Sequence, residues 1–272
     1  MINQCKFLTL SFSGAGHLLP YHLGAIASIR NDEKLISKPK PISAVSGSSS
    51  GAIAATLFVY FPTDQIKEFA DRFISDGGRA MYHLKDMIYD TKIYTNDIEH
   101  DTSLHIAATR CSDGALQLFD FPSNLSSISD KDHLVSCLQA SCKIPPHFHP
   151  ADVLNSSSSI TYPEEDGTMI DGQTYVDGGI AAPAPPTPLD SMEGACRVVI
   201  SPISGDSSEN TIRISPNDTS LKFPMNVKCK GGFTVYPSIQ NFQAMQISAG
   251  LASPHLLQEW YDRGVEDGIR IH

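Results

Sequence analysis

The sequence predicts a single α/β domain over residues 1–272, with helices flanking a mainly parallel central sheet. Short apolar runs typical of strands alternate with helical patterns along the chain. Two turns of small residues each stand between an expected strand and an expected helix. We find no internal repeat and no linker that would divide the chain, so one domain is expected.

The N-terminal third has the clearest pattern. Residues 7–12 (FLTLSF) form a β-rich run, and residues 18–30 have the apolar spacing of a helix. Residues 42–46 predict a second strand, and the apolar residues 52–60 predict a buried helix. An amphipathic helix is expected at residues 64–75.

The remaining elements are less regular, but each has a local signal in the sequence. In chain order we expect paired strands at 104–109 and 115–121, a helix at 131–141, a surface loop at 155–166, a strand tip at 174–176, a Pro-rich extended connector at 181–188, a buried strand at 197–201 and a helix at 254–271.

Composition and charge exclude several classes of protein. Hydrophobic residues make up 41% of the chain and charged residues 18%, which is globular and not disordered. The net charge of −10 argues against a nucleic-acid partner, because phosphate binding needs a basic surface. It also argues against strong general attraction to anionic lipid, although a local basic patch is compatible with it.

The chain has no signal for export or for crossing a membrane. Residues 1–6 are polar and lack a signal-peptide pattern, and the apolar stretch 51–61 is too short to span a bilayer. We therefore expect a soluble, cytoplasmic protein. The six cysteines, at positions 5, 111, 137, 142, 196 and 229, include no CxxC pair, so we expect reduced and mostly buried thiols.

The strongest chemical signal is GSSSG at residues 47–51, a G-x-S-x-G between a strand and a helix. Its glycines permit a tight turn that holds the central Ser49 strained and exposed at the sheet edge. The N-terminus of the following helix adds positive potential near a developing oxyanion. The competing interpretation is a Gly/Ser turn without chemistry.

A second small-residue turn, Gly14-Ala15-Gly16, also links a strand to a helix. Acyl transfer needs backbone N–H groups aimed at an oxyanion, and small residues let a substrate approach them closely. A dinucleotide loop is excluded because Leu19 stands where the last glycine should be, and a P-loop lacks its Gly-Lys-Ser/Thr ending. A plain tight turn remains the alternative.

The third signal is YVDGG at residues 175–179, where Asp177 ends a strand and two glycines follow. This position suits a carboxylate that faces a cleft. Asp76 also precedes two glycines, but it follows an amphipathic helix, so we interpret it as a helix C-cap.

The glycine loop in LSFSGAGHLLPYHLGAIAS (residues 10–28), the GSSSG turn and YVDGG together resemble the patatin-like phospholipases, most closely their adipose-triglyceride-lipase-like branch. Weaker similarities are ASCKIP (140–145), SPISG (201–205) and YDRG (261–264). These motifs span nearly the whole chain in family order. The chain departs from the branch at Leu19, where a glycine is usual, and at Ala181 and Ala182, where a polar residue is frequent.

The resemblance implies a patatin-like fold and a catalytic dyad of Ser49 and Asp177, with an oxyanion hole around Gly14, Ala15 and Gly16. It implies lipid ester substrates presented at a membrane or lipid-droplet surface, and no metal or other cofactor. An ordinary aspartate is a poor base for a serine hydroxyl. The site must therefore be largely dry, so that desolvation makes Asp177 a stronger base.

Several alternatives remain open from the sequence. His255 follows Asp177 in the chain, so Ser49, Asp177 and His255 would match the order of an α/β-hydrolase triad. His17 adjoins the glycine loop and could line the cleft, although packing would also explain it. The function classes are a lipid acyl-hydrolase, an acyltransferase or transacylase that uses the same residues, and a lipid-binding module without catalysis.

Overall fold

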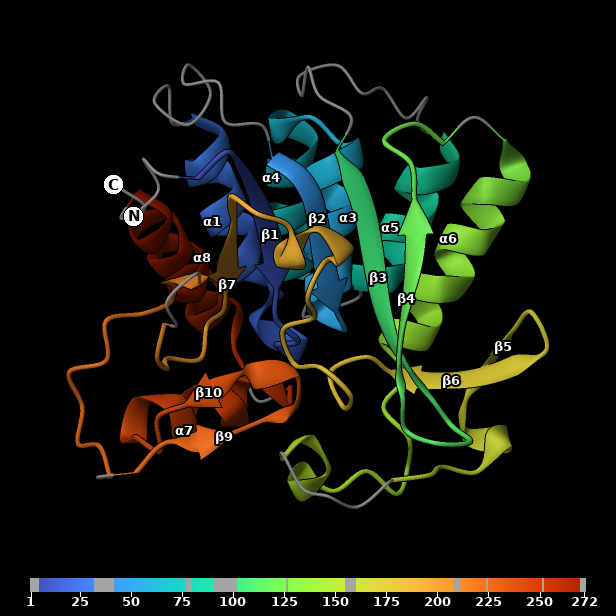
Figure 1. Cartoon of the computed structure of the whole chain (residues 1–272). Coiled ribbons are helices and arrows are strands. Elements are labelled where there is room, and N and C mark those ends of the chain that lie inside the picture. The colour runs from blue at the N-terminus through green and yellow to red at the C-terminus, as the bar shows by residue number, and fades with distance from the viewer. Residues whose placement is uncertain are drawn as a thin grey trace.

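The structure is a computed structural model that describes residues 5–31, 42–76, 80–90, 102–125, 127–154, 160–207, 211–223, 225–250 and 252–269 (Figure 1). Its strands are β1 (Phe7–Phe12), β2 (Ile42–Ser48), β3 (Ser103–Arg110), β4 (Leu116–Phe121), β5 (Thr168–Ile170), β6 (Gln173–Asp177), β7 (Ala195–Ile200), β8 (Thr211–Ile214), β9 (Val227–Lys228) and β10 (Thr234–Val235). Its α-helices are α1 (Leu19–Asn31), α3 (Ser50–Tyr60), α4 (Thr63–Ser75), α5 (Ala80–Asp90), α6 (Ile128–Ser141), α7 (Ile239–Ser248) and α8 (Pro254–Gly268). The 3-10 turns are η2 (Gly16–Leu18), η3 (Pro150–Val153), η4 (Glu164–Asp166), η5 (Pro188–Ser191) and η6 (Lys230–Gly232).

The central sheet has the strand order β5-β6-β3-β2-β1-β7-β8, and β4 also pairs with β3. Strands β3, β2, β1, β7 and β8 run parallel, whereas β4, β6 and β5 add antiparallel pairs at one side. The predicted α/β class with a mainly parallel sheet and flanking helices is confirmed.

Two strands share one edge of β3. Strand β2 pairs with β3 up to Ser48, which lies opposite Ala107, and β6 takes over one residue later, where Asp177 lies opposite Ala108. Strand β4 pairs with these same residues of β3, so it must occupy the other edge. The end of β2 and the end of β6 therefore meet on one edge of β3.

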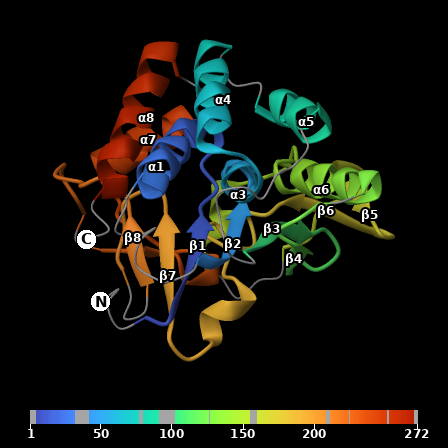
Figure 2. The same cartoon turned by 90° about the horizontal axis from the view of Figure 1, so that it is seen from above.

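The long helices gather on one side of the strands in Figure 2, and the segment that carries η5 lies on the other side. Helices α1 and α8 approach closely because both have a glycine at the crossing. A Cβ on Gly24 would lie 2.0 Å from the Tyr261 carbonyl oxygen, and a Cβ on Gly264 would lie 2.0 Å from that of Tyr21. The apolar α3 is buried along its whole length, as its composition predicts.

Most of the predicted elements are present, with shifted ends. Helix α3 begins at Ser50 and α6 at Ile128, earlier than predicted, because the apolar pattern does not mark their polar first turns. Asp76 is the C-cap of α4, which confirms its interpretation. The predicted loop at 155–166 lies partly outside the described residues, as do the glycines after Asp76 and the end of the last predicted helix. Helices α5 and α7 and the short strands β5, β8, β9 and β10 were not predicted.

One prediction about the cysteines is wrong. Cys5 and Cys196 form a disulfide, with their Cα atoms 5.6 Å apart. Residues 191 positions apart become neighbours because β7 pairs directly with β1, a relation that no local spacing reveals. The other four cysteines are free thiols, and three of them are buried, in line with the prediction.

No described helix combines the length and the apolar character that crossing a membrane requires.

Candidate active site

The turn between β2 and α3 holds Ser49 in a strained backbone conformation, with φ 53° and ψ −130°. Ser49 is partly exposed, whereas its neighbours Ser48 and Ser50 are buried. The two glycines of the motif are required by close packing. A Cβ on Gly47 would lie 2.2 Å from the carbonyl oxygen of Gly51, and a Cβ on Gly51 would lie 2.3 Å from that of Phe12. The G-x-S-x-G pattern therefore presents one hydroxyl at the end of the sheet.

The predicted carboxylate lies beside this serine. Asp177 ends β6 and is 5% exposed, and burial raises its pKa from 3.8 to about 6. The Ser49 side chain and the N–H of Gly179, which donates to Oδ1 at 2.8 Å, act in the opposite direction and favour the charged form. Oδ2 is buried and makes no hydrogen bond of ordinary geometry to another described residue. The carboxylate thus has one oxygen held in place and one oxygen available.

A single segment, residues 141–143 at the end of α6, contacts both halves of this pair. The Oγ of Ser141 accepts the N–H of Ser49 at 2.9 Å, and the carbonyl of Ser141 accepts the N–H of Gly178 at 3.2 Å. The carbonyl of Lys143 accepts the N–H of Asp177 at 2.9 Å. These bonds fix the backbone of Ser49 relative to that of Asp177.

The glycine loop lies against the serine turn, but its three predicted N–H donors are not equivalent. The N–H of Gly14 donates to the carbonyl of Pro183 at 2.8 Å, and that of Ala15 donates to Ser50 Oγ at 3.0 Å. The N–H of Gly16 makes no hydrogen bond to the part of the chain that the structure describes. Gly14 and Ala15 therefore anchor the loop, and Gly16 has a free donor.

His22, in helix α1, supports the backbone of Ser13, the residue just before the glycine loop. Its Nε2–H donates to the carbonyl of Ser13 at 2.8 Å. Complete burial lowers the pKa of His22 to about 4, so the imidazole is neutral at physiological pH. His22 holds the loop in place and does not supply a proton-accepting group at Ser49.

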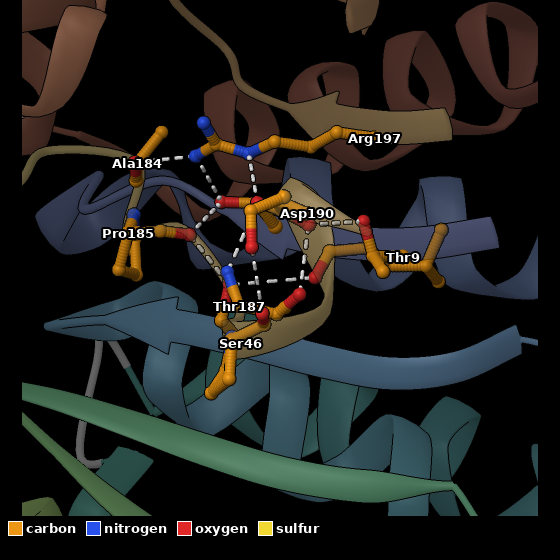
Figure 3. A network of polar contacts seen from close by, with 11 residues as sticks. Thr9, Ser46, Ala184, Pro185, Thr187, Asp190 and Arg197 are labelled. Carbon is orange, nitrogen blue, oxygen red and sulfur yellow. Dashed lines mark hydrogen bonds and ion pairs between the residues drawn. The ribbon is translucent and has the colours of Figure 1, made fainter. Parts of the chain in front are cut away.

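The Pro-rich segment 181–188 covers the face of β1 and β2 that lies opposite the helices, and polar contacts hold it there (Figure 3). The carbonyl of Pro185 accepts bonds from Ser11 Oγ at 2.7 Å and Ser46 Oγ at 2.6 Å. Arg197 Nη2 donates to the carbonyl of Ala184 at 2.6 Å, and its guanidinium lies 3.3 Å from Asp190. The Pro-rich connector, which follows Asp177 after Gly178, Gly179 and Ile180, is thus held against the sheet by these contacts.

The histidines that the sequence left open do not join the site. His255 lies in the first turn of α8 with 86% of its side chain exposed, and its Nδ1 is 3.3 Å from Glu259. Within the described ranges, no histidine hydrogen-bonds to Ser49 or Asp177. Partly exposed His17 adjoins Gly250, and its ring lies 6.3 Å from that of Phe73 in a tilted arrangement.

A Ser–His–Asp chain does exist elsewhere in the molecule. Ser103 Oγ is 2.9 Å from His105 Nε2, and His105 Nδ1 is 2.5 Å from Asp120 Oδ1. It lies near the start of β3, away from the strand ends that carry Ser49 and Asp177, and Ser103 has no strained turn and no following helix. Cross-strand pairing of His105 with Asp120 explains this arrangement as a structural contact.

The chain belongs to the patatin-like phospholipase family, whose family model matches residues 10–190. This range includes the glycine loop, the serine turn and the Asp177 loop. Family membership supports lipid acyl-hydrolase or acyltransferase activity in general.

Three relatives illustrate the similarity. Human patatin-like phospholipase domain-containing protein 4 is 24% identical, over 98% of this chain and 96% of its own length. Rat patatin-like phospholipase domain-containing protein 2 is 24% identical, over 96% of this chain and 50% of its own length. Mouse omega-hydroxyceramide transacylase is 23% identical, over 96% of this chain and 40% of its own length. The chain therefore spans nearly all of the first relative but half or less of the other two.

Several residues that shape the site have no clear signal in the sequence. Ser141, Ser50 and the carbonyl of Pro183 all bind the backbone of the serine turn or the glycine loop. The only signals were the ASCKIP similarity and the prolines after YVDGG, and neither shows which backbone group is bound.

Proposed function

We propose that this protein is a lipid carboxylic ester hydrolase in which Ser49 is the nucleophile and Asp177 is its base. The observation that carries the proposal is the buried Asp177 carboxylate, which interacts with a strained, partly exposed serine at a strand end. The lack of a histidine contact to either residue, among those described, favours a dyad over the triad with His255.

In this mechanism Asp177 accepts the proton of Ser49 as Oγ attacks the ester carbonyl. The tetrahedral oxyanion is stabilised by the free N–H of Gly16, while Gly14 and Ala15 hold the loop against the serine turn. Collapse of the intermediate expels the alcohol, which takes the proton from Asp177, and leaves an acyl group on Ser49. Water, deprotonated by Asp177, then releases the fatty acid and restores the serine.

The proposed substrates are acylglycerols or phospholipids, at a triacylglycerol lipase or phospholipase A type of site. The names of two relatives, a patatin-like phospholipase domain-containing protein and a transacylase, support lipid substrates. The transacylase is the reason to keep a second candidate, in which a lipid alcohol replaces water at the last step. Product analysis with and without an added acceptor lipid separates the two reactions.

Ser49→Ala tests the nucleophile. It should remove esterase activity and covalent labelling by a fluorophosphonate, with a loss of several orders of magnitude in kcat. The reason is that, in the proposed mechanism, the hydroxyl of Ser49 is the group that attacks the ester. The measurements are hydrolysis of acylglycerol, phospholipid and p-nitrophenyl esters, and gel detection of the label.

Ser103→Ala is the matched control, because Ser103 also contacts a histidine that is bound to an aspartate. It should leave labelling and hydrolysis at the wild-type level. A labelled Ser49→Ala protein, or an unlabelled wild-type protein, would reject the proposal.

A further inference from the structure

Six large apolar side chains stand exposed on one late segment of the chain, residues 221–245. They are Leu221, Phe223, Met225, Ile239, Phe242 and Met245, and each is more than half exposed. We call them the α7 surface. Water-exposed aromatic and aliphatic side chains are common singly, but a group of them indicates a binding surface.

The backbone places these side chains together. Residues 221–223 run beside residues 237–239, because the N–H of Phe223 donates to Pro237 at 2.9 Å and the N–H of Ile239 donates to Leu221 at 3.3 Å. Along α7, Ile239, Phe242 and Met245 follow at intervals of three, within an arc of roughly 120° of the helix. Ala244 and Ile247 face the core on the other side, so this helix is apolar on both faces.

Charge distinguishes this region from the rest of the molecule. The chain carries 30 acidic residues and a net charge of −10, yet residues 219–258 contain no aspartate or glutamate. The same stretch contains Lys222, Lys228 and Lys230, and the first two of these are exposed. Two carboxylates from neighbouring segments contact this stretch, since Asp206 accepts the hydroxyl of Tyr236 at 2.6 Å and Asp218 accepts that of Ser238. The charged side chains that the stretch itself contributes are lysines, and lysines interspersed with exposed apolar side chains are typical of a surface that lies on phospholipid headgroups.

The α7 surface is joined to the candidate active site. A Cβ on Gly16 would lie 2.1 Å from the carbonyl oxygen of Ser248, so the end of α7 packs directly on the glycine loop. Met245 precedes Ser248 by three residues, or about 4.5 Å along the helix axis. In Figure 1, β9, β10 and α7 lie below β7, at the end of the sheet that also carries η2.

Hydrogen bonds of Asn241 anchor helix α7, which carries Ile239, Phe242 and Met245. Asn241, buried in α7, accepts the N–H of Ser204 at 2.8 Å and donates to the carbonyls of Ser204 and Tyr236, both at 2.8 Å. These three exposed side chains are therefore presented by a helix that is already formed, which lowers the ordering cost of docking.

We propose that the α7 surface docks the protein on a phospholipid surface that contains anionic headgroups, with the glycine loop turned toward the lipid. This inference rests on the proposed function, because it takes the substrate to be a lipid at an interface. The aromatic and aliphatic side chains enter the headgroup region, and Lys222 and Lys228 contact the phosphates.

The test is co-sedimentation with vesicles of phosphatidylcholine, with and without phosphatidylserine. All proteins carry Ser49→Ala, so that binding is measured without hydrolysis and independently of the proposed function. The parent protein should bind, and phosphatidylserine should strengthen its binding. The variant Phe223→Ser/Phe242→Ser should bind at least about tenfold more weakly, because it loses two exposed aromatic side chains that the proposal places in the lipid. The variant Lys222→Ser/Lys228→Ser should lose the effect of phosphatidylserine.

Tyr82→Ser/Ile128→Ser is the matched control, since it removes two exposed apolar side chains from α5 and α6. It should bind as the parent does, and circular dichroism should show that every variant is folded. Equal binding by the parent and the Phe223/Phe242 variant would overturn the proposal. So would a parent that fails to bind vesicles and instead forms a dimer that this variant dissociates.

Discussion

Asp177 shows how the site and the stability of the protein are coupled at the level of one residue. Its folded-state pKa of about 6 lies above the ordinary value of 3.8. Between these two pH values the folded protein binds the proton more tightly than the unfolded chain does, so stability falls as pH rises through this window. At neutral pH the ionised carboxylate costs the fold about 3 kcal/mol.

We therefore expect Asp177→Asn to be nearly inactive and more stable than the wild type at pH 7. The amide oxygen keeps the bond from Gly179, and the buried charge is gone. The expected gain is up to about 3 kcal/mol, reduced by the poorly satisfied amide NH2. Urea unfolding at pH 7 and pH 4 measures it, and the gain should shrink at pH 4, where wild-type Asp177 is protonated.

In the proposed mechanism, the same pKa sets the pH dependence of turnover. Asp177 must be ionised to accept the serine proton, so kcat/KM should rise with pH and level off above about 6. A pH–rate profile with a short soluble ester measures this midpoint. A midpoint near 4 would mean that the buried Asp177 is not the base.

At the level of elements, the end of α6 determines how the serine turn and the aspartate loop sit relative to each other. Ser141 uses its side chain for one and its carbonyl for the other. Ser49 also carries backbone strain at φ 53°, which costs about 1–3 kcal/mol and needs support from neighbouring bonds.

Ser141→Ala should lower kcat about tenfold or more, with a smaller effect on KM. It leaves the N–H of Ser49 without its acceptor, and an unsatisfied buried donor costs about 1–3 kcal/mol. Steady-state kinetics on a soluble ester measures the changes in kcat and in KM separately. Ser136→Ala, on the exposed side of the same helix, is the control and should behave as the wild type, since its hydroxyl bonds only to Asp132.

The elements that the sequence predicts well are those with a strong local pattern. The serine turn, the glycine loop and β6 each combine an apolar run with glycines, so their ends could be placed within a few residues. Strands β9 and β10 have two residues each, too short for any periodicity. Helix α7 was missed because its exposed side is apolar, so the usual contrast between a polar and an apolar face is absent.

The contacts between elements were beyond local patterns. Nothing near Ser141 in the sequence indicates that its hydroxyl binds Ser49, 92 residues away. The dry environment of Asp177 could be expected from the chemistry that the resemblance implied, and its burial agrees with this expectation. The hydrogen bond from the Gly14 N–H to the carbonyl of Pro183 could not be expected from the sequence, because it depends on how the Pro-rich segment crosses β1.

At the scale of the whole molecule, the disulfide between Cys5 and Cys196 joins the start of the chain to β7. Replacing both cysteines with serine should lower the free energy of unfolding by about 2–5 kcal/mol, because the bond closes a very long loop in the unfolded chain. Urea unfolding of the double variant beside the oxidised wild type measures the loss. Cys137→Ser, at a buried free thiol, shows the cost of a buried cysteine substitution without a lost crosslink.

The shared edge of β3 has a consequence for how the protein is made. Ser49 is in place once β1, β2 and β3 have assembled, but Asp177 reaches it only after β6 has been synthesised and paired. A growing chain that has released only its first 170 residues contains the serine turn but not Asp177, the proton acceptor of the proposed mechanism. In the proposed mechanism, hydrolysis therefore has to wait until β6 has closed onto β3, which requires synthesis as far as residue 177 of 272.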